Sequence, residues 1–548
     1  MTRSPSPIRI PLLGWEIVYY ALLAVIFTVA IHLRVQLPPV PFLDWDSWDY
    51  LQPAITPFVQ GTEIPTYREF FYPWLLKQML WGCPNFSIII IVQHSVGILA
   101  AILILLTWHR MRIFLPLGMT VDVLHRAGGL ILTALYLFAQ ISVLDEHKIR
   151  PEAFLELAIA LSLWVATEFS RRTFLKQRFG MREGVLGVLL IFLSSVAYYL
   201  RPYYGIGVLC ALLPLFVALV MIPGNRMIKG GSLVCSVALV FVLLVCPDRQ
   251  VHSLHKFSGN DYYLAETLFC SSAEMVYDLL QKDAHTLPAD DPKRPIAENM
   301  LQYMNMVIGH PSNHYAGYTR FDPDDVRYYG PMGNLKRDLQ WDGKQVKDFC
   351  YSYYFRAWEQ YPFRMFKKIL DQLWFFYSPP RYRVYDPEKS LDASNELQRS
   401  KEVLQNEPSY SWTPFQNYKY QVLSLQGRNW VIKMPKLVLF MGRIMNALYS
   451  VSLLLTLIAT VALQLGWLKE TRNTLKYTGF WALYLFSYNF GMSLTIALVH
   501  VMGQRRYTFG QTLFSALSEC FALVFLFSLI PALLPLLKIC NSWSLKKP

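Results

Sequence analysis

Long apolar stretches recur along the chain, separated by short polar segments. About ten of them approach 20 residues, the length at which a helix rising 1.5 Å per residue crosses the hydrocarbon core of a bilayer. The stretches are 12–33, 87–108, 127–144, 153–169, 185–200, 203–222, 230–246, 437–466, 477–501 and 509–537. This pattern predicts an α-helical polytopic membrane protein with about ten transmembrane helices.

Positive charge collects in every second connecting segment. Of the 548 residues, 54% are hydrophobic and only 16% are charged, against roughly 25% charged in an average soluble protein. The formal net charge is +13. With a cytoplasmic N-terminus, every cytoplasmic loop is basic, as the positive-inside rule requires. Membrane topology therefore explains the excess of Lys and Arg, and binding of nucleic acid is not needed to account for it.

One long polar segment, residues 247–434, interrupts the apolar pattern. Its length and its scattered Asp, Pro, Tyr and Trp residues are typical of a small folded domain. We predict an N-terminal transmembrane module at 1–246 with a first outer loop at 34–86, a periplasmic or luminal soluble domain at 247–434, and C-terminal transmembrane helices at 435–548. Cys270 and Cys350 lie in the soluble domain, either as a disulfide or as two buried thiols.

Three carboxylates stand within six positions of the first outer loop, in the run Asp44-Trp45-Asp46-Ser47-Trp48-Asp49-Tyr50. The tryptophans suit the membrane interface. A carboxylate held there is partly desolvated, which raises its pKa and makes it a better base toward a hydroxyl. The alternative is that these acids are helix caps and solvated turn residues. We favour a reactive site because charge buried at an interface is costly.

Basic residues gather at the predicted outer ends of the helices. At this depth a lipid presents its phosphate headgroup, and a guanidinium can hold a phosphate by two parallel hydrogen bonds. Ordinary snorkelling toward the interface is the alternative for any single residue. As a group they indicate a site for an anionic lipid. The residues are Arg68, Lys148, Arg150, Arg201, Arg505 and Arg506.

Five short fragments follow one another on the predicted outer face. They are Asp46-Ser47-x-x-Tyr50, Arg68-x-Phe70-x-Tyr72-Pro73-x-Leu75-Leu76, Pro151-Glu152-Ala153-Phe154, Leu200-Arg201-Pro202, and Arg505-Arg506-Tyr507 preceded by His500. Their order resembles the GT-C membrane glycosyltransferases related to the lipid A aminoarabinose transferases and the protein O-mannosyltransferases. Phe70 departs from the proline of the usual pattern. The resemblance covers the spans and their short loops and says little about residues 247–434.

The resemblance implies a GT-C-like fold and transfer of a sugar, with inversion, from a polyprenyl-monophosphate-linked donor to an acceptor hydroxyl. Asp46, or else Asp44, would take the proton from the acceptor. The partners would be the donor lipid, a glycan, lipid or protein acceptor, and membrane lipids. No metal-binding motif is present, and a divalent cation beside the carboxylates is left open. The residues expected to bind substrate are Asp49, Tyr50, Arg68, Tyr72, Glu152, Arg201, His500, Arg505, Arg506 and Tyr507.

Two other functions fit the same outline. An O-antigen polymerase or ligase also combines many spans with a large outer loop, but carboxylates in the first outer loop argue against it. A transporter or flippase should have charged midplane sites and inverted repeats, and the sequence has no such repeat. We expect a multi-pass protein of a bacterial inner membrane, with a cytoplasmic N-terminus and a periplasmic active site.

Overall fold

Helices that can cross a bilayer dominate the protein. The computed structural model describes residues 10–61, 68–254, 263–308, 320–328, 330–378, 385, 388–407, 410–425, 430–466, 474–499 and 511–544. Within these ranges eight helices have the length and hydropathy of a membrane span, which confirms the polytopic α-helical fold class. They are α1 (Ile10–Val35), α4 (Ser87–Met111), α7 (Glu152–Lys176), α8 (Met181–Leu200), α11 (Arg226–Val240), α22 (Lys436–Gln464), α23 (Thr474–Val499) and α25 (Thr512–Ser544).

Two of these regions contain irregular or bent helices. α11 continues through a π-helical turn at Phe241–Val245 into α12 (Cys246–Leu254), so that one span covers both helices. α5 (Met119–Leu137) and α6 (Gln140–His147) are bent by 46° against each other. Counted as one broken span, the bent pair brings the described total to nine, against the ten stretches read from the sequence.

The stretch 203–222 does not form a single long helix. It contains the short helices α9 (Gly205–Ala211) and α10 (Leu213–Met221). Pro214 stands in the first turn of α10, where a proline has no N–H with which to continue the hydrogen bonds of a preceding helix. Apolar composition alone therefore overestimates the number of unbroken spans.

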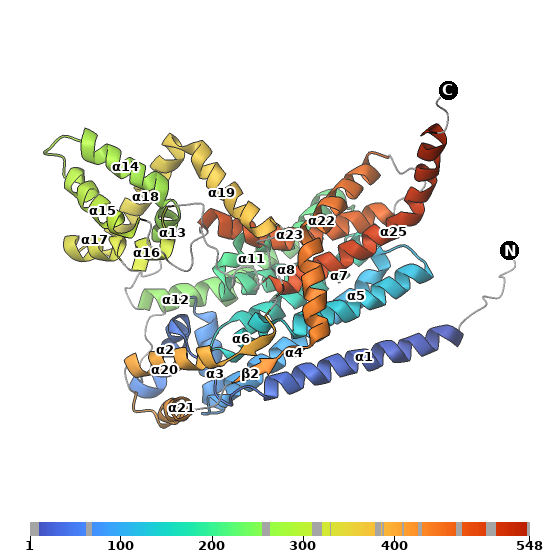
Figure 1. The fold of residues 1–548 in the computed structure, drawn as a ribbon, viewed down its shortest axis with the longest axis horizontal. Coiled ribbons are helices and arrows are strands. Elements are labelled where there is room, and N and C mark those ends of the chain that lie inside the picture. The colour runs from blue at the N-terminus through green and yellow to red at the C-terminus, as the bar shows by residue number, and fades with distance from the viewer. Residues whose placement is uncertain are drawn as a thin grey trace.

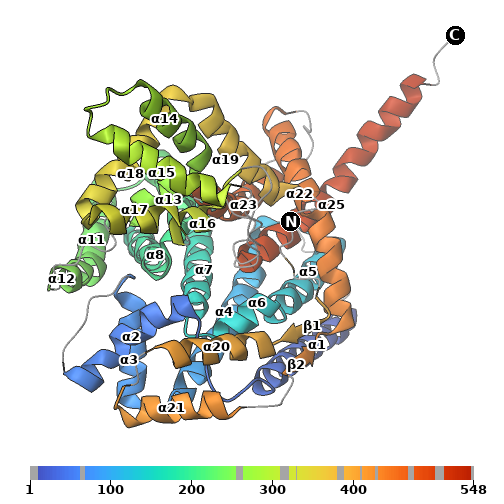
Figure 2. The same cartoon turned by 60° about the vertical axis from the view of Figure 1, so that its left-hand side comes forward.

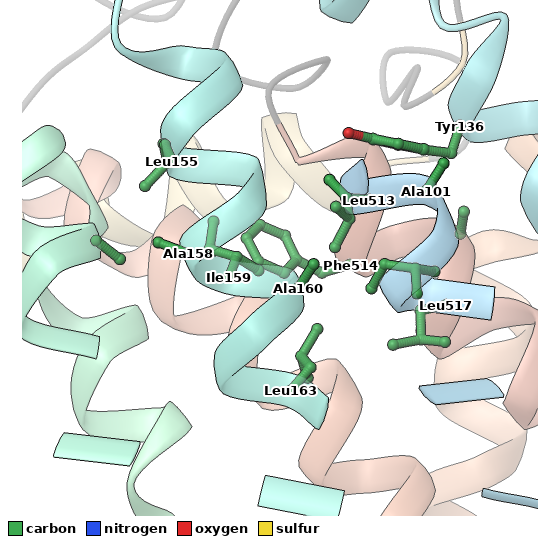
Figure 3. Close-up of a cluster of buried hydrophobic side chains, with 14 of the residues drawn as sticks. Ala101, Tyr136, Leu155, Ala158, Ile159, Ala160, Leu163, Leu513, Phe514 and Leu517 are labelled. Carbon is green, nitrogen blue, oxygen red and sulfur yellow. The ribbon is translucent and has the colours of Figure 1, made fainter. Parts of the chain in front are cut away.

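The middle of the bundle is an apolar core to which α4, α5, α7 and α25 contribute. Figure 3 shows part of it, with Ala101 from α4, Tyr136 from α5, Ile159 and Leu163 from α7, and Leu517 from α25. All five side chains are almost fully buried. Because lipid tails are as apolar as leucine, such contacts stabilise a membrane bundle through close packing. The bundle thereby holds the segments at the helix ends in fixed positions.

The first half of the polar segment has a hydrophobic core of its own, in which Phe269, Leu280 and Met300 are buried. Figure 1 shows its helices in green to yellow, gathered at one end of the membrane helices. How the chain divides into domains stays a prediction. The helices are α13 (Tyr263–Ser271), α14 (Ala273–Thr286), α15 (Lys293–Val307), α16 (Pro323–Tyr328), α17 (Pro331–Leu339) and α18 (Gly343–Gln360).

The second half of the polar segment belongs to the main core instead. β1 (Ser390–Asp392) pairs antiparallel with β2 (Val431–Lys433), and Leu391 lies opposite Ile432. The chain between the strands forms α20 (Ser394–Asn406) and α21 (Thr413–Ser424). Figure 2 shows these two helices beside α2 (Trp45–Gln60) and α3 (Phe71–Gly82), which the first outer loop forms. The remaining described α-helix is α19 (Pro362–Tyr377).

Cys270 and Cys350 are free thiols buried in the smaller core, so the structure has two thiols there and no disulfide between them. Burial raises the pKa of both thiols. Since the thiolate is the reactive form, we expect maleimide to label neither residue until the protein is unfolded. Mass spectrometry of labelled peptides, with the exposed Cys83 as positive control, measures this. Labelling of Cys270 as fast as Cys83 in the folded protein would contradict the expectation.

Candidate active site

The acidic run of the first outer loop forms the start of α2. Asp44 is the N-cap, and its Oδ1 accepts hydrogen bonds from the backbone N–H and the hydroxyl of Ser47, at 2.8 and 2.7 Å. A carboxylate in this position satisfies amide groups that the first helical turn leaves free. The helix then places Asp46 and Asp49, three residues apart, on the same side. Helix geometry thus separates a capping acid from two acids that face the same region.

Arg68 joins the two acids of α2. Its Nη2 donates to Asp46 Oδ1 at 2.9 Å, and its Nε donates to Asp49 Oδ2 at 3.2 Å. The guanidinium also lies over the ring of Tyr50, 5.7 Å from the centroid. Arg68 therefore joins the segment that precedes α3 to the face of α2 that bears Asp46 and Asp49.

Arg150 reaches the same acids from the connection between α6 and α7. A short parallel bridge holds this connection against the first loop: Phe42 N–H donates to His147 O, and Ile149 N–H donates to Phe42 O. Arg150 Nη2 then lies 2.5 Å from Asp44 Oδ2 and 3.3 Å from Asp46 Oδ2. The carboxylate of Asp46 consequently has Arg68 at one oxygen and Arg150 at the other.

Glu152 and Arg201 extend the cluster along the helix ends. Glu152 is the first residue of α7, and Arg201 follows the last residue of α8. Arg201 Nη2 donates to Glu152 Oε1, and its Nη1 donates to the hydroxyl of Tyr50 at 2.9 Å. Glu152 Oε2 is buried and has no hydrogen-bond partner among the described residues. That oxygen is available to accept a hydrogen bond from a ligand.

Tyr72 lies behind this cluster. Its hydroxyl donates to Gln93 Oε1 at 3.0 Å, and its ring packs edge-on against Tyr50, with 5.3 Å between the centroids. Both tyrosines are buried, and burial raises the pKa of Tyr50 to about 12. The Tyr50 hydroxyl therefore keeps its proton at neutral pH, and Tyr72 positions Tyr50.

The acids at the start of α2 have different surroundings. Burial raises the pKa of Asp44, but the charges of Arg150 and Lys148 outweigh it, so the pKa lies below its ordinary value. Burial raises the pKa of Asp49, and Arg68 offsets only part of that rise. The side chain of Asp44 is 13% exposed, against 34% for Asp46. Asp44 is thus a buried, ionised cap, whereas Asp46 is open to a substrate.

Part of the predicted site falls outside the residues that the structure describes: His500, Arg505, Arg506 and Tyr507. The other predicted residues, from the first loop, α7 and the end of α8, come together. The sequence pattern places Arg150 only among the headgroup-binding arginines, yet it contacts two of the acids. Its position directly before Pro151 and Glu152 is the sequence feature that indicates a role in the site.

α20 and α21 hold the first loop from outside. Ser400 Oγ accepts from Leu43 N–H, and the hydroxyl of Tyr418 donates to Pro41 O, both at 2.8 Å. Lys148 Nζ lies 3.2 Å from Glu396 Oε2 on α20. These partners are separated by more than 240 residues in the chain, so no local sequence pattern indicates them.

The pair between Lys148 and Glu396 is largely buried, at 12% and 13% side-chain exposure. Replacing Lys148 by Met should lower the free energy of unfolding by about 2 kcal/mol, because it removes the buried cation that faces the Glu396 carboxylate. Arg399→Gln is the matched control, since Arg399 contacts the same carboxylate but is 63% exposed. Thermal unfolding of both variants measures the difference. Equal stability of the two variants would show that the buried pair does not anchor α20.

Comparison with known proteins gives little beyond this geometry. No protein-family model matches the chain, and no curated protein matches it. The chain is similar to the crystal structure of ArnT from Cupriavidus metallidurans in the apo state, at 10% identity and a TM-score of 0.31. That match covers 93% of this chain and 77% of the other. A superposition this loose carries no argument about activity.

The acids of the site face basic side chains. Across the described ranges, no group of three or more His, Cys, Asp or Glu residues is placed to hold one. Asp44, Asp46 and Asp49 each face an arginine instead. Participation of a divalent cation stays open.

Proposed function

We propose that the protein is a GT-C-type membrane glycosyltransferase, which moves a sugar from a polyprenyl-monophosphate carrier to an acceptor hydroxyl. One observation carries the proposal: Asp46, an accessible carboxylate, lies between Arg68 and Arg150. Transfer from a lipid phosphate needs a base for the acceptor and a cation for the leaving phosphate at the same point. The cluster offers both kinds of group.

The position of the cluster in the bundle suits a lipid-linked donor. It lies where α1 ends, α4 and α7 begin and α8 ends. The other ends of α4 and α7 carry Arg110, Arg171 and Arg172, which surround Glu168. By the positive-inside rule that basic end is cytoplasmic, and the cluster is periplasmic. A lipid phosphate in the outer leaflet would then reach the arginines.

The proposed reaction begins by freeing the base. Without a donor, each oxygen of Asp46 accepts a hydrogen bond from an arginine. The donor phosphodiester, with one negative charge, competes for Arg68 and Arg150 through charge-assisted hydrogen bonds. Donor binding would therefore turn these guanidiniums toward the phosphate and release the carboxylate.

A single displacement then completes the transfer. Asp46 takes the proton of the acceptor hydroxyl as its oxygen bonds to the anomeric carbon, and the bond from that carbon to the phosphate oxygen breaks. The carrier leaves as a phosphate monoester, and the arginines stabilise its additional negative charge. One displacement inverts the anomeric carbon. The buried Glu152 Oε2 would accept a hydrogen bond from a sugar hydroxyl.

Reconstitution tests the proposal against its two rivals. Purified protein in liposomes receives either a polyprenyl-monophosphate sugar or a lipid diphosphate glycan, with soluble acceptors. We expect release of polyprenyl phosphate and a product with inverted anomeric configuration, read by chromatography and NMR. Turnover of the diphosphate donor alone would favour a polymerase or ligase. Movement of solute or lipid across the bilayer without glycosyl transfer would favour a transporter or flippase.

A further inference from the structure

α19 has an exposed apolar face. Phe363, Phe366, Leu370 and Trp374 recur at intervals of three and four residues, so they form one stripe along the helix. Their exposed fractions range from 48% at Leu370 to 89% at Phe363. A stripe of this kind beside basic residues is typical of a helix whose apolar face contacts lipid.

The C-terminal end of α19 is fixed to two membrane helices. The hydroxyl of Tyr377 donates to Asn489 Oδ1 on α23, and Ser450 Oγ on α22 donates to Tyr377 O, both at 2.6 Å. Figure 1 shows α19 meeting α22 and α23 at this end and diverging from α22 toward its other end. Asn489 and Ser450 lie near the middle of α23 and α22, whereas Lys368 contacts Leu498 at the end of α23. The stripe therefore runs from beside the middle of the membrane helices toward their end.

Lys368 lies on the adjoining face of α19 and is almost completely buried. Among the described residues, its Nζ contacts two neutral oxygens: Ser271 Oγ at 3.4 Å and Leu498 O at 3.2 Å. Burial lowers the pKa of Lys368 to about 7, as expected for a cation without a counter-charge. No carboxylate among the described residues forms an ion pair with it.

A cavity of about 90 Å³ opens beside Lys368, lined also by α13, α14 and α16. The other charged residues of its lining already have partners. Arg364 pairs with Asp278, Lys367 pairs with Asp371, and Glu274 pairs with Arg320. The lining has three basic and two acidic residues, so its surplus is one positive charge when Lys368 is protonated.

We propose that this cavity binds the phosphodiester headgroup of an anionic phospholipid whose acyl chains lie along the apolar stripe of α19. A phosphodiester carries one negative charge, which matches the surplus of the lining, whereas a phosphate monoester carries 1.5 to 2. The volume exceeds what a single water needs. The bound lipid would join α13, α19 and the end of α23 at the surface of the bilayer.

Lipid retention in purified protein tests the site. Native mass spectrometry in mild detergent counts bound phosphatidylglycerol in the unaltered protein, in Lys368→Met and in Lys367→Met. Lys367 lines the same cavity but is 73% exposed, so its replacement is the matched control. We expect Lys368→Met to bind phosphatidylglycerol at least tenfold more weakly, and Lys367→Met to bind it as the unaltered protein does. Removing a buried unpaired charge does not threaten folding.

Further measurements test the stripe and distinguish a phospholipid from other phosphate-bearing ligands. Phe366→Asp places a charge in the stripe and leaves the cavity intact, so it should also weaken retention. Titrations with phosphatidylcholine, with a polyprenyl phosphate and with inorganic phosphate should show weaker binding than phosphatidylglycerol. Equal binding of inorganic phosphate, tighter binding of the polyprenyl phosphate, or unchanged retention in Lys368→Met would each overturn the proposal.

Discussion

Replacing Asp46 by Asn should slow sugar transfer by about 10²-fold or more, the usual scale for loss of a general base. Asparagine keeps the size of the side chain and its carbonyl still accepts from an arginine, but it takes no proton from the acceptor. Donor binding should not weaken, because the phosphate no longer competes with a carboxylate for Arg68 and Arg150. Initial rates and equilibrium binding of the same lipid donor separate the two effects.

The neighbouring acids provide the controls for this experiment. Asp49→Asn should retain more activity than Asp46→Asn, because Asp49 contacts one arginine at 3.2 Å and Asp46 contacts two. Asp44→Asn keeps a good helix cap but weakens the contact with Arg150, so it should lower stability more than Asp49→Asn does. Near-normal turnover by Asp46→Asn, with a large loss in Asp49→Asn, would move the base to Asp49.

Replacing Arg150 by Met should cost both stability and donor affinity. The change leaves Asp44 buried without its cation, and breaking a buried ion pair costs about 3–5 kcal/mol. It also removes one of the two guanidiniums at Asp46. Arg150→Lys should recover part of the stability, because it restores the charge but not the guanidinium, whose Nη2 contacts both carboxylates. Thermal unfolding and donor titration measure the two losses.

An exposed arginine serves as the control for Arg150. Arg337 also contacts an aspartate, but it is 72% exposed, so Arg337→Met should change the free energy of unfolding by less than about 1 kcal/mol. The Arg150 variant also tests where the phosphate binds. If Arg150→Met bound donor normally and Arg506→Ala did not, the phosphate site would lie in the last connection between spans, as the sequence motif there predicts.

The sequence by itself determined the fold class of the protein and predicted most residues of the candidate site. Crossing a bilayer depends on the length and hydropathy of contiguous residues, so 12–33 and 437–466 indicate spans without any knowledge of their neighbours. The acids of the first loop are also contiguous, and one helical turn is enough to place Asp46 and Asp49 together. Local spacing likewise located Glu152 and Arg201 at the ends of predicted helices.

Only the tertiary structure decided which of these residues meet. Arg150 is about 100 residues from Asp46, and Glu396 is 248 residues from Lys148, so their pairing depends on how the bundle and α20 pack. The same holds for Lys368, which has no carboxylate partner among the described residues because of what surrounds it and not because of its own helix. Hydropathy and helical period are properties of a segment, whereas ion pairing and desolvation are properties of packed surroundings.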